Sequence, residues 1–157
     1  MRLTICGGGT GGHVYPALAL ARFALQQDKE AQILFVGTER GLESRIVPAA
    51  GFRLSTITAR GYQRGLRQAG PVAKALFAGF AQAREILRDF NPDLVLGMGG
   101  YVSAPVVMAA VFDRRPAVIH EQNAIPGLAN RILAPLVSRV CISFEQSGRL
   151  FSRLSHV

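Results

Sequence analysis

The stretch RLTICGGGTGGH, residues 2–13, joins a short apolar segment to a run of glycines and decides the fold class. Segment 2–6 lacks the alternation of apolar and polar side chains that marks a half-exposed strand, so it predicts a strand buried on both faces. A helix is expected over 14–27, directly after the glycines, with Pro16 near its first turn, where proline is tolerated. Strand, glycine turn and helix in that order are typical of a parallel α/β sheet.

The rest of the chain repeats this alternation of strand and helix. The expected strands lie at 32–36, 53–57, 94–96, 117–119 and 140–142, and the expected helices at 42–49, 71–90, 103–112, 126–134 and 145–154. A polar, glycine-containing loop is expected over 58–70. We therefore predict an α/β, Rossmann-like, doubly wound parallel sheet, and the 157 residues fit one domain covering 1–157.

Composition narrows the class of protein but leaves its partner open. With 49% hydrophobic and 18% charged residues, the chain can bury a core and is not a disordered tail. Its net charge of +8 is compatible with nucleic acid, an anionic membrane surface or phosphorylated substrates. The uncharged stretch 94–112 is interrupted by glycines and a proline, so it predicts strand, loop and helix rather than a membrane span. The chain starts with a strand, which argues against a signal peptide.

Cys6 and Cys141 each stand in an apolar stretch that predicts a buried strand. Free cysteine is among the residue types most often buried, so both are expected to be core residues. Two buried thiols without a secretory signal indicate a reducing compartment.

The first glycine loop (7–13) has the properties of a phosphate-binding turn. Its glycines let a ligand approach the main chain closely, and the helix behind it offers free N–H groups and the positive end of a dipole. The glycines at 7, 9 and 12 also fit the G-x-G-x-x-G pattern, which keeps the NAD- or nucleotide-binding domain of an oxidoreductase as an alternative. Against that alternative, Gly37-Thr38 stands where an acidic residue should end the second strand. No lysine follows the loop, which excludes a P-loop.

A second glycine loop (97–101) follows the fourth expected strand. In the Rossmann strand order, strands one and four are neighbours at the switch point where the crevice opens. We therefore expect the two glycine loops to face each other across one cleft and to hold a ligand such as a diphosphate from both sides. An ordinary dinucleotide-binding domain needs only the first loop.

Polar residues follow the fifth expected strand as HEQN, residues 120–123. Side chains at the carboxyl end of a parallel strand belong to the ligand site more often than to the core, although they could instead cap the helix expected from 126. Asn123 suits a sugar hydroxyl, because its amide both donates and accepts. His13 could act as a general base near neutral pH, or it could merely cap the helix; its position favours neither.

These motifs resemble the MurG family of UDP-GlcNAc-dependent N-acetylglucosaminyltransferases, within glycosyltransferase family 28. The matching strings are GGTGGH (8–13) with PALA (16–19), GT (37–38) with GLE (41–43), GMGGYVS (97–103), and HEQN (120–123) with PG (126–127) and Asn130. They are spread over most of the chain, in the order and at the spacing of the family.

The resemblance implies a GT-B fold of two Rossmann-like domains, with this chain as the N-terminal, acceptor-binding domain and no C-terminal UDP-GlcNAc-binding domain within it. It implies inverting transfer of GlcNAc from UDP-GlcNAc to the C4 hydroxyl of MurNAc on undecaprenyl diphosphate (lipid I), with no metal or other cofactor. Such a chain alone is expected to be inactive. A related UDP-sugar transferase acting on another glycolipid is the nearest alternative within the fold.

The resemblance also implies roles for individual residues. His13 would be the candidate base, with Tyr101 nearby. Contacts to the donor sugar would come from Thr10, Gly11, Gly12 and Asn123, and contacts to the acceptor diphosphate and sugar from Gly8, Gly9, Gly99, Gly100 and Gln122.

The helix expected over 71–90 carries apolar residues nearly all round its first half and lies in a stretch rich in bases. This pattern also fits a core helix with a solvated basic face, and a membrane-binding module without chemistry is a further alternative. With a lipid-linked substrate, we expect peripheral attachment to the cytoplasmic face of an anionic membrane. The expected contact residues are Leu76, Phe77, Phe80, Arg67 and Lys74. Nucleic acid is not expected, because the bases lack interleaved aromatic residues.

Overall fold

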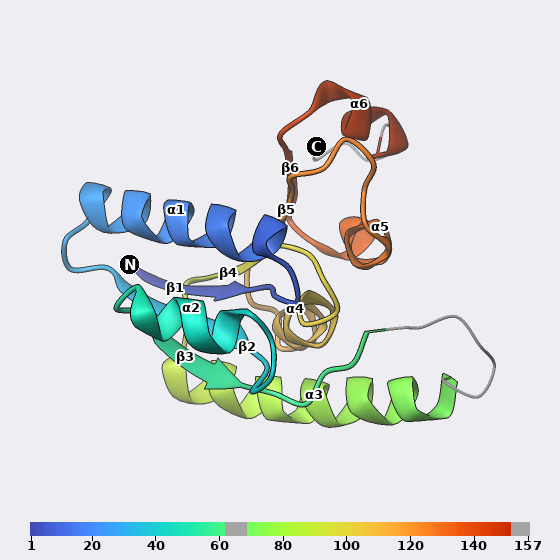
Figure 1. Ribbon diagram of the computed structural model, residues 1–157, viewed down its shortest axis with the longest axis horizontal. Coiled ribbons are helices and arrows are strands. Elements are labelled where there is room, and N and C mark those ends of the chain that lie inside the picture. Colours follow the sequence, from blue (N-terminus) through green and yellow to red (C-terminus); the bar gives the residue numbers. More distant parts are fainter. Residues whose placement is uncertain (62–68, 152–157) are drawn as a thin grey trace.

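The computed structural model describes residues 1–61 and 69–151, which build a six-stranded parallel sheet with helices on both faces (Figure 1). The strands are β1 (Arg2–Cys6), β2 (Gln32–Gly37), β3 (Arg53–Thr56), β4 (Leu94–Gly97), β5 (Ala117–Glu121) and β6 (Arg139–Ile142). The helices are α1 (Gly11–Gln27), α2 (Glu43–Ala49), α3 (Ala69–Phe90), α4 (Ser103–Phe112), α5 (Leu128–Leu133) and α6 (Glu145–Gly148), with 3₁₀ turns at Ala134–Leu136 and Arg149–Phe151. This arrangement confirms the predicted α/β, doubly wound sheet.

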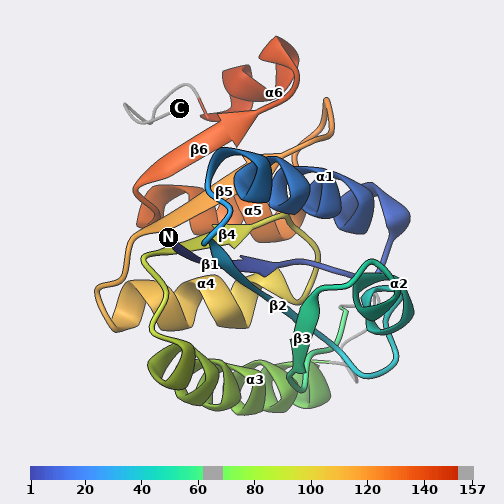
Figure 2. The same ribbon diagram turned by 90° about the vertical axis from the view of Figure 1, so that its left-hand side faces the viewer.

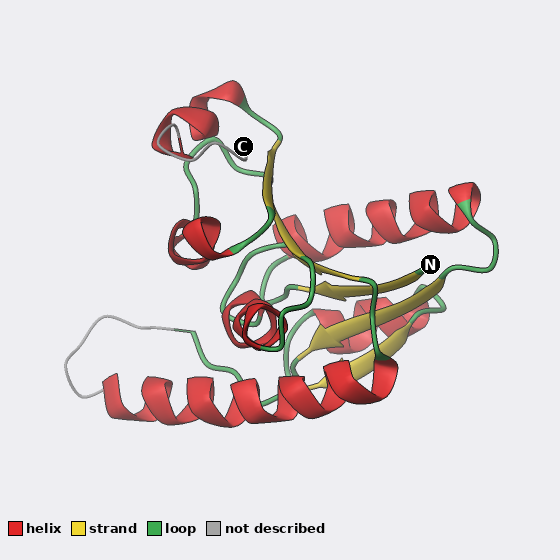
Figure 3. Cartoon of the chain, turned by 180° about the vertical axis from the view of Figure 1, so that it is seen from behind, coloured by secondary structure: helices red, strands yellow, loops and turns green. Residues whose placement is uncertain are grey.

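Both faces of the sheet are covered, which explains why the strands are apolar without alternation. Leu3 and Ile5 of β1 pack into the core layer that includes the buried side chains of α1. Cys6, one residue further on, packs into the opposite layer, which includes buried side chains of α3 and α4. Figure 2 shows α1 on one side of the sheet and α3 and α4 on the other, and Figure 3 shows α4 between the sheet and α3.

The strand order β3-β2-β1-β4-β5-β6 places the switch point between β1 and β4. Leu3 pairs with Ile33 of β2 on one side and with Leu94 of β4 on the other. The connections from these two central strands run to opposite faces, so a crevice opens beyond their carboxyl ends. Both glycine loops therefore lie at the same edge of the sheet, as predicted.

Several element bounds differ from the prediction, and each difference has a local cause. Helix α1 begins at Gly11 rather than at residue 14, so two glycines of the first loop form its first turn. Strand β5 extends to Glu121 because its ladder with β6 continues to Ile142. Helix α5 begins at Leu128 rather than at 126, because Gly127 is extended and donates its N–H to the Glu121 side chain.

The prediction that both cysteines are core residues is right for Cys6 and wrong for Cys141. Cys6 lies on the central strand β1, and burial raises the pKa of its thiol to about 12, so it stays protonated. Cys141 lies on β6, the last strand of the sheet, where it is exposed. An apolar run of residues does not distinguish a central strand from an edge strand, and this caused the error.

Candidate functional site

The two glycine loops touch each other at the carboxyl ends of β1 and β4. A Cβ on Gly100 would lie 2.6 Å from the Gly8 carbonyl oxygen, and a Cβ on Gly7 would lie 2.9 Å from the Cβ of Met98. Gly100 also has a positive φ of 77°, a backbone conformation that residues with a side chain rarely adopt. The loops therefore form one continuous floor rather than two walls of a gap. The expectation that a ligand is held between them is corrected: a ligand has to lie over both.

The N–H groups of the first loop are not equally available to a ligand. Gly9 donates its N–H to the Glu43 carboxyl over 3.0 Å, so this donor is already used. Gly11 and Gly12 are the first two residues of α1, where backbone N–H groups have no carbonyl partner within the helix. Thr10, at the N-cap, makes no side-chain cap hydrogen bond. An anion above this loop would therefore meet the start of α1 rather than Gly9.

Glu43 is the buried group that holds the first loop in place, and sequence reasoning gave it no role. It is 1% exposed and accepts hydrogen bonds from the N–H of Gly9 and from both the N–H and the hydroxyl of Thr38, at 2.8–3.0 Å. A Cβ on Gly8, Gly37 or Gly41 would collide with its side chain. The only sequence signal was the placing of an acid beside several glycines that leave room for it.

Glu121 holds the opposite side of the site in a similar way. It is 1% exposed. Its Oε1 accepts from the N–H and side-chain amide of Asn123, and its Oε2 accepts from the N–H of Gly127 and the amide of Asn130, at 2.8–3.0 Å. Burial raises the pKa of Glu121, but these hydrogen bonds together outweigh burial and hold the pKa below its usual range. Glu121 thus shapes the loop after β5.

His13 lies where the floor, α1 and the loop after β5 meet. Its Nδ1 is 2.8 Å from the hydroxyl of Thr10, and a Cβ on Gly99 would lie 3.1 Å from its Nε2. Burial lowers the pKa of His13, while the charges of Glu121 and Glu43 and a hydrogen bond with the Gly8 backbone oppose this in part. The imidazole is therefore mostly neutral at pH 7 and can accept a proton.

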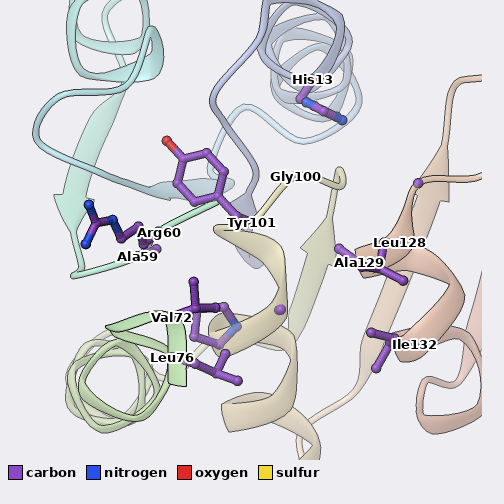
Figure 4. Close-up of a pocket in the computed structure, with 13 residues that line it drawn as sticks. His13, Ala59, Arg60, Val72, Leu76, Gly100, Tyr101, Leu128, Ala129 and Ile132 are labelled. Atoms are coloured by element: carbon purple, nitrogen blue, oxygen red, sulfur yellow. The ribbon is translucent and has the colours of Figure 1, made fainter. Parts of the chain in front are cut away.

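Tyr101 and His13 lie on different sides of a cavity of about 380 Å³ beside the glycine floor (Figure 4). The Tyr101 ring fits against Gly9, where a Cβ would lie 2.9 Å from its Cε1, and against Gly61. Its hydroxyl points away from His13 in Figure 4, so the two side chains do not form a pair. Tyr101 thus forms part of the cavity wall at the second loop.

The residues after β5 separate into buried and accessible ones. Asn123 is exposed, and its amide nitrogen donates to Glu121, which leaves its carbonyl oxygen open to a ligand. Gln122 is half-buried. Asn130 is 1% exposed, and its Oδ1 makes no hydrogen bond within residues 1–61 and 69–151. Asn130 and His13 both pack beside Gly99, where a Cβ would lie 3.4 Å from the Asn130 amide nitrogen and 3.1 Å from the His13 ring.

Four of the five expected membrane-contact residues lie on α3. Phe77 is 75% exposed and Lys74 is exposed, whereas Leu76 and Phe80 are half-buried. Phe80 packs edge-on against Phe112 of α4, which is 63% exposed and extends the apolar surface. Arg67 lies outside the described residues. In the part of the chain that the structure describes, no helix has the length and apolar character to cross a membrane.

The described residues hold no group of three or more His, Cys, Asp or Glu side chains arranged to bind a metal ion. The acids of the site, Glu43 and Glu121, are instead used to accept hydrogen bonds from N–H and O–H groups. Thr10, Gly11, Gly12 and His13 come together at the start of α1. Gly8, Gly99 and Gly100 form the floor below them, and Asn123 and Gln122 follow β5 at the same edge of the sheet.

Comparison with known proteins identifies relatives of the whole chain. Residues 3–142 match the sequence model of the glycosyltransferase family 28 N-terminal domain. A curated protein of Caldanaerobacter subterraneus, named UDP-N-acetylglucosamine–N-acetylmuramyl-(pentapeptide) pyrophosphoryl-undecaprenol N-acetylglucosamine transferase, is 54% identical over 100% of this chain and 43% of its own length. A protein of the same name from Geobacter sulfurreducens is 51% identical over 96% of this chain and 42% of its own. The chain thus spans about two fifths of the length of these relatives.

Solved structures agree with the sequence matches. The crystal structure of Acinetobacter baumannii MurG superposes with a TM-score of 0.78 at 31% identity, over 91% of this chain and 41% of that one. The Staphylococcus aureus MnaA–UDP structure gives a TM-score of 0.71 at 15% identity, over 99% of this chain and 41% of that one, which shows a shared fold alone. These matches do not favour the oxidoreductase alternative.

Proposed function

The chain belongs to glycosyltransferase family 28, and from that premise we propose that it is the acceptor-binding half of a transferase acting in peptidoglycan synthesis. The reaction is inverting transfer of GlcNAc from UDP-GlcNAc to the C4 hydroxyl of MurNAc on undecaprenyl diphosphate, giving lipid II. Through the cell wall, this activity serves cell shape and division. The observation that carries the proposal is a mostly neutral His13 at the junction of the helix start, the glycine floor and the cavity.

In the proposed reaction His13 acts as the general base. Its Nδ1 is hydrogen-bonded with the hydroxyl of Thr10, which leaves Nε2, beside Gly99, to face the acceptor. Nε2 takes the proton of the C4 hydroxyl as the oxygen attacks C1 of GlcNAc, and the C1–O bond to UDP breaks with its electron pair leaving on UDP. A base with a pKa below its usual range accepts this proton at neutral pH without first losing one.

The acceptor diphosphate lies over the glycine floor in this proposal. The start of α1 supplies unpaired N–H groups at Gly11 and Gly12 together with the positive end of its dipole. A diphosphate held in this way needs no metal ion, and none is proposed. Asn123 offers its open carbonyl oxygen to a donor-sugar hydroxyl, and UDP is expected to bind outside this chain.

The test is an NMR titration of the chain with a water-soluble analogue of MurNAc-pentapeptide diphosphate, with NADH in parallel. Amide shifts at residues 8–13 and 97–101 with the acceptor analogue, and none with NADH, are the expected result. Shifts with NADH alone would refute the acceptor-binding role. In the two-domain enzyme, His13→Gln is expected to lower kcat by at least about 100-fold with little change in KM for the acceptor.

We also propose that the exposed apolar surface of Phe77, Phe80 and Phe112 contacts the cytoplasmic face of an anionic membrane. Phe77 and Phe112 are exposed, and Lys74 lies beside them on α3. Sedimentation with vesicles of phosphatidylglycerol and phosphatidylcholine tests this. Phe77→Ser should reduce the bound fraction several-fold, whereas Phe23→Ser, at an equally aromatic and 57% exposed position on α1, should not. Equal loss in both variants would overturn the assignment.

A further inference from the structure

The cavity beside the glycine floor changes character along its length. At one end stand His13, Gly100 and Tyr101, which belong to the proposed site. The remaining walls are mainly apolar and come from three helices that are distant in sequence. They are formed by Val72 and Leu76 of α3, Ala104 and Pro105 of α4, and Leu128, Ala129 and Ile132 of α5.

The outer edge of this cavity leaves large apolar side chains in solvent. Leu128 is 62% exposed and Ile132 is 56% exposed, although both line the cavity. Figure 4 shows them on the α5 side, opposite Val72 and Leu76 on the α3 side. Contiguous apolar surface that is open to water and continues into a cavity marks a place where apolar material binds.

We propose that this cavity binds the branched hydrocarbon nearest the diphosphate of the acceptor, that is, the first isoprene units of its polyprenyl chain. The inference rests on the proposed function, because that function places a diphosphate over the glycine floor. A chain leaving the diphosphate at Gly100 enters the apolar part of the cavity directly.

The size of the cavity limits what it can hold. A volume of about 380 Å³ lies at the lower end of ordinary ligand pockets, so it takes a short segment and not a whole polyprenyl lipid. The rest of the chain would leave between α3 and α5, past Leu76 and Ile132. The cavity would then set the depth at which the reacting sugar stands above the bilayer.

The test compares geranyl diphosphate with methyl diphosphate in membrane-free buffer, using the whole 157-residue chain and isothermal titration calorimetry. Each methylene buried tightens Kd by about fourfold, so burial of only three predicts a gain of about 60-fold for the geranyl compound. A gain below about fivefold in the wild-type chain would overturn the cavity assignment.

Two variants test whether the gain in affinity for geranyl diphosphate comes from the cavity. Ala129→Leu fills the space from α5 and should reduce the gain to a few-fold. Ile132→Asn removes an apolar wall at a position that is 56% exposed and should reduce the gain in the same way. The matched control is Ala81→Leu, which adds the same atoms at an exposed position of α3 outside the cavity and should keep the gain. Phe77→Ser should also keep it, because Phe77 does not line the cavity. If the control and cavity variants lose the gain equally, the proposal is wrong.

A third compound separates this inference from the proposed function. MurNAc-pentapeptide diphosphate carrying a methyl group tests the sugar site alone. If it fails to perturb the glycine loops while geranyl diphosphate still binds with the expected gain, the acceptor role fails and the hydrocarbon site stands. If the sugar compound binds and the geranyl group adds no affinity over methyl, only the hydrocarbon site is refuted.

Discussion

Glu43 and Glu121 are both 1% exposed, and both accept hydrogen bonds on their two carboxyl oxygens at the edges of the same site. Within residues 1–61 and 69–151 neither forms an ion pair. They differ in what they join. Glu43 connects segments far apart in the chain, since its donor Gly9 is 34 residues away, whereas the donors to Glu121 follow within nine residues. One acid fixes the packing of two loops, and the other closes a single loop.

The two acids also differ in the space around them. Three glycines surround Glu43 so closely that a Cβ on any of them would collide with its side chain. On the other side, a Cβ on Gly127 would meet nothing within 4 Å, although the N–H of Gly127 donates to Glu121. A methyl group added at these glycines on the Glu43 side would therefore collide with the acid, whereas one at Gly127 would displace nothing. This difference makes the two sides unequally sensitive to substitution.

The largest effect is expected for Glu43→Gln. The amide nitrogen replaces an acceptor with a donor, and it faces either the N–H of Gly9 or the N–H and hydroxyl of Thr38, so buried donors lose their partners. We expect a loss of about 3–5 kcal/mol in the free energy of unfolding, measured by urea denaturation. Glu121→Gln should cost about 1–3 kcal/mol, because two of its donor residues, Asn123 and Gly127, are exposed and can donate to water instead. Equal losses would remove the distinction between the two sides.

The next effect concerns the glycines rather than the acids. Gly41→Ala should destabilise by about 2–3 kcal/mol, because its methyl group displaces the Glu43 carboxyl from buried partners. Gly127→Ala is the matched control, with an ordinary φ of −66° and open space, and should be neutral or stabilising by about 0.5 kcal/mol. Thermal unfolding of both variants checks this pair, and a costly Gly127→Ala would contradict the description of an open loop.

A third prediction uses pH to isolate Glu121. Hydrogen bonds hold its pKa in the folded chain below its usual range, so its stabilising contribution is fully present above the pKa of the unfolded chain. The contribution is lost as pH falls through the folded pKa. Glu121→Gln should therefore flatten the fall in urea midpoint between about pH 5 and pH 3. Glu145→Gln, at an exposed acid, serves as control; an unchanged slope in Glu121→Gln would sink this explanation.

The smallest expected effect is on the pKa of His13, which both acids influence. Burial lowers the pKa of His13, and the negative charges of Glu121 and, more weakly, Glu43 raise it. Removing either charge should therefore lower the pKa further, and Glu121→Gln should do so more than Glu43→Gln. NMR titration of the His13 ring protons measures both shifts. A larger change in Glu43→Gln would show that the loop after β5 is not the nearer electrostatic partner.

Much of the fold could be predicted because strands and helices alternate and each strand is a plain apolar run. The first strand, at 2–6, matches β1 in full, and the long helix predicted to 90 ends at Phe90. The burial of a strand was mispredicted where it depends on which strands lie beside it in the sheet, because the sequence of a strand does not show this. Cys141 was expected in the core because nothing in its strand shows that β6 lies at the sheet edge.

The site was predicted in outline and missed in its internal contacts. The glycine loops, His13 and HEQN do meet at one edge of the sheet, because the strand order brings them there. The role of Glu43 was not visible, since one partner is a backbone N–H on a distant loop and the other, Thr38, belongs to its own β2–α2 connection. For the same reason the use of the Gly9 N–H could not be foreseen. Hydrogen-bond partners supplied by the backbone leave no pattern of residue types.

The pairing of β1 with both β2 and β4 has a consequence for the order of events on the ribosome. β1 can pair with β2 once about 40 residues have emerged, but Leu3 meets Leu94 only after more than twice that length has been synthesised. During this interval the second edge of β1 is unpaired, and an unpaired apolar strand invites association with other chains. The glycine floor is completed only when residues 97–100 arrive, so a stalled nascent chain would expose β1 before any ligand could bind to protect it.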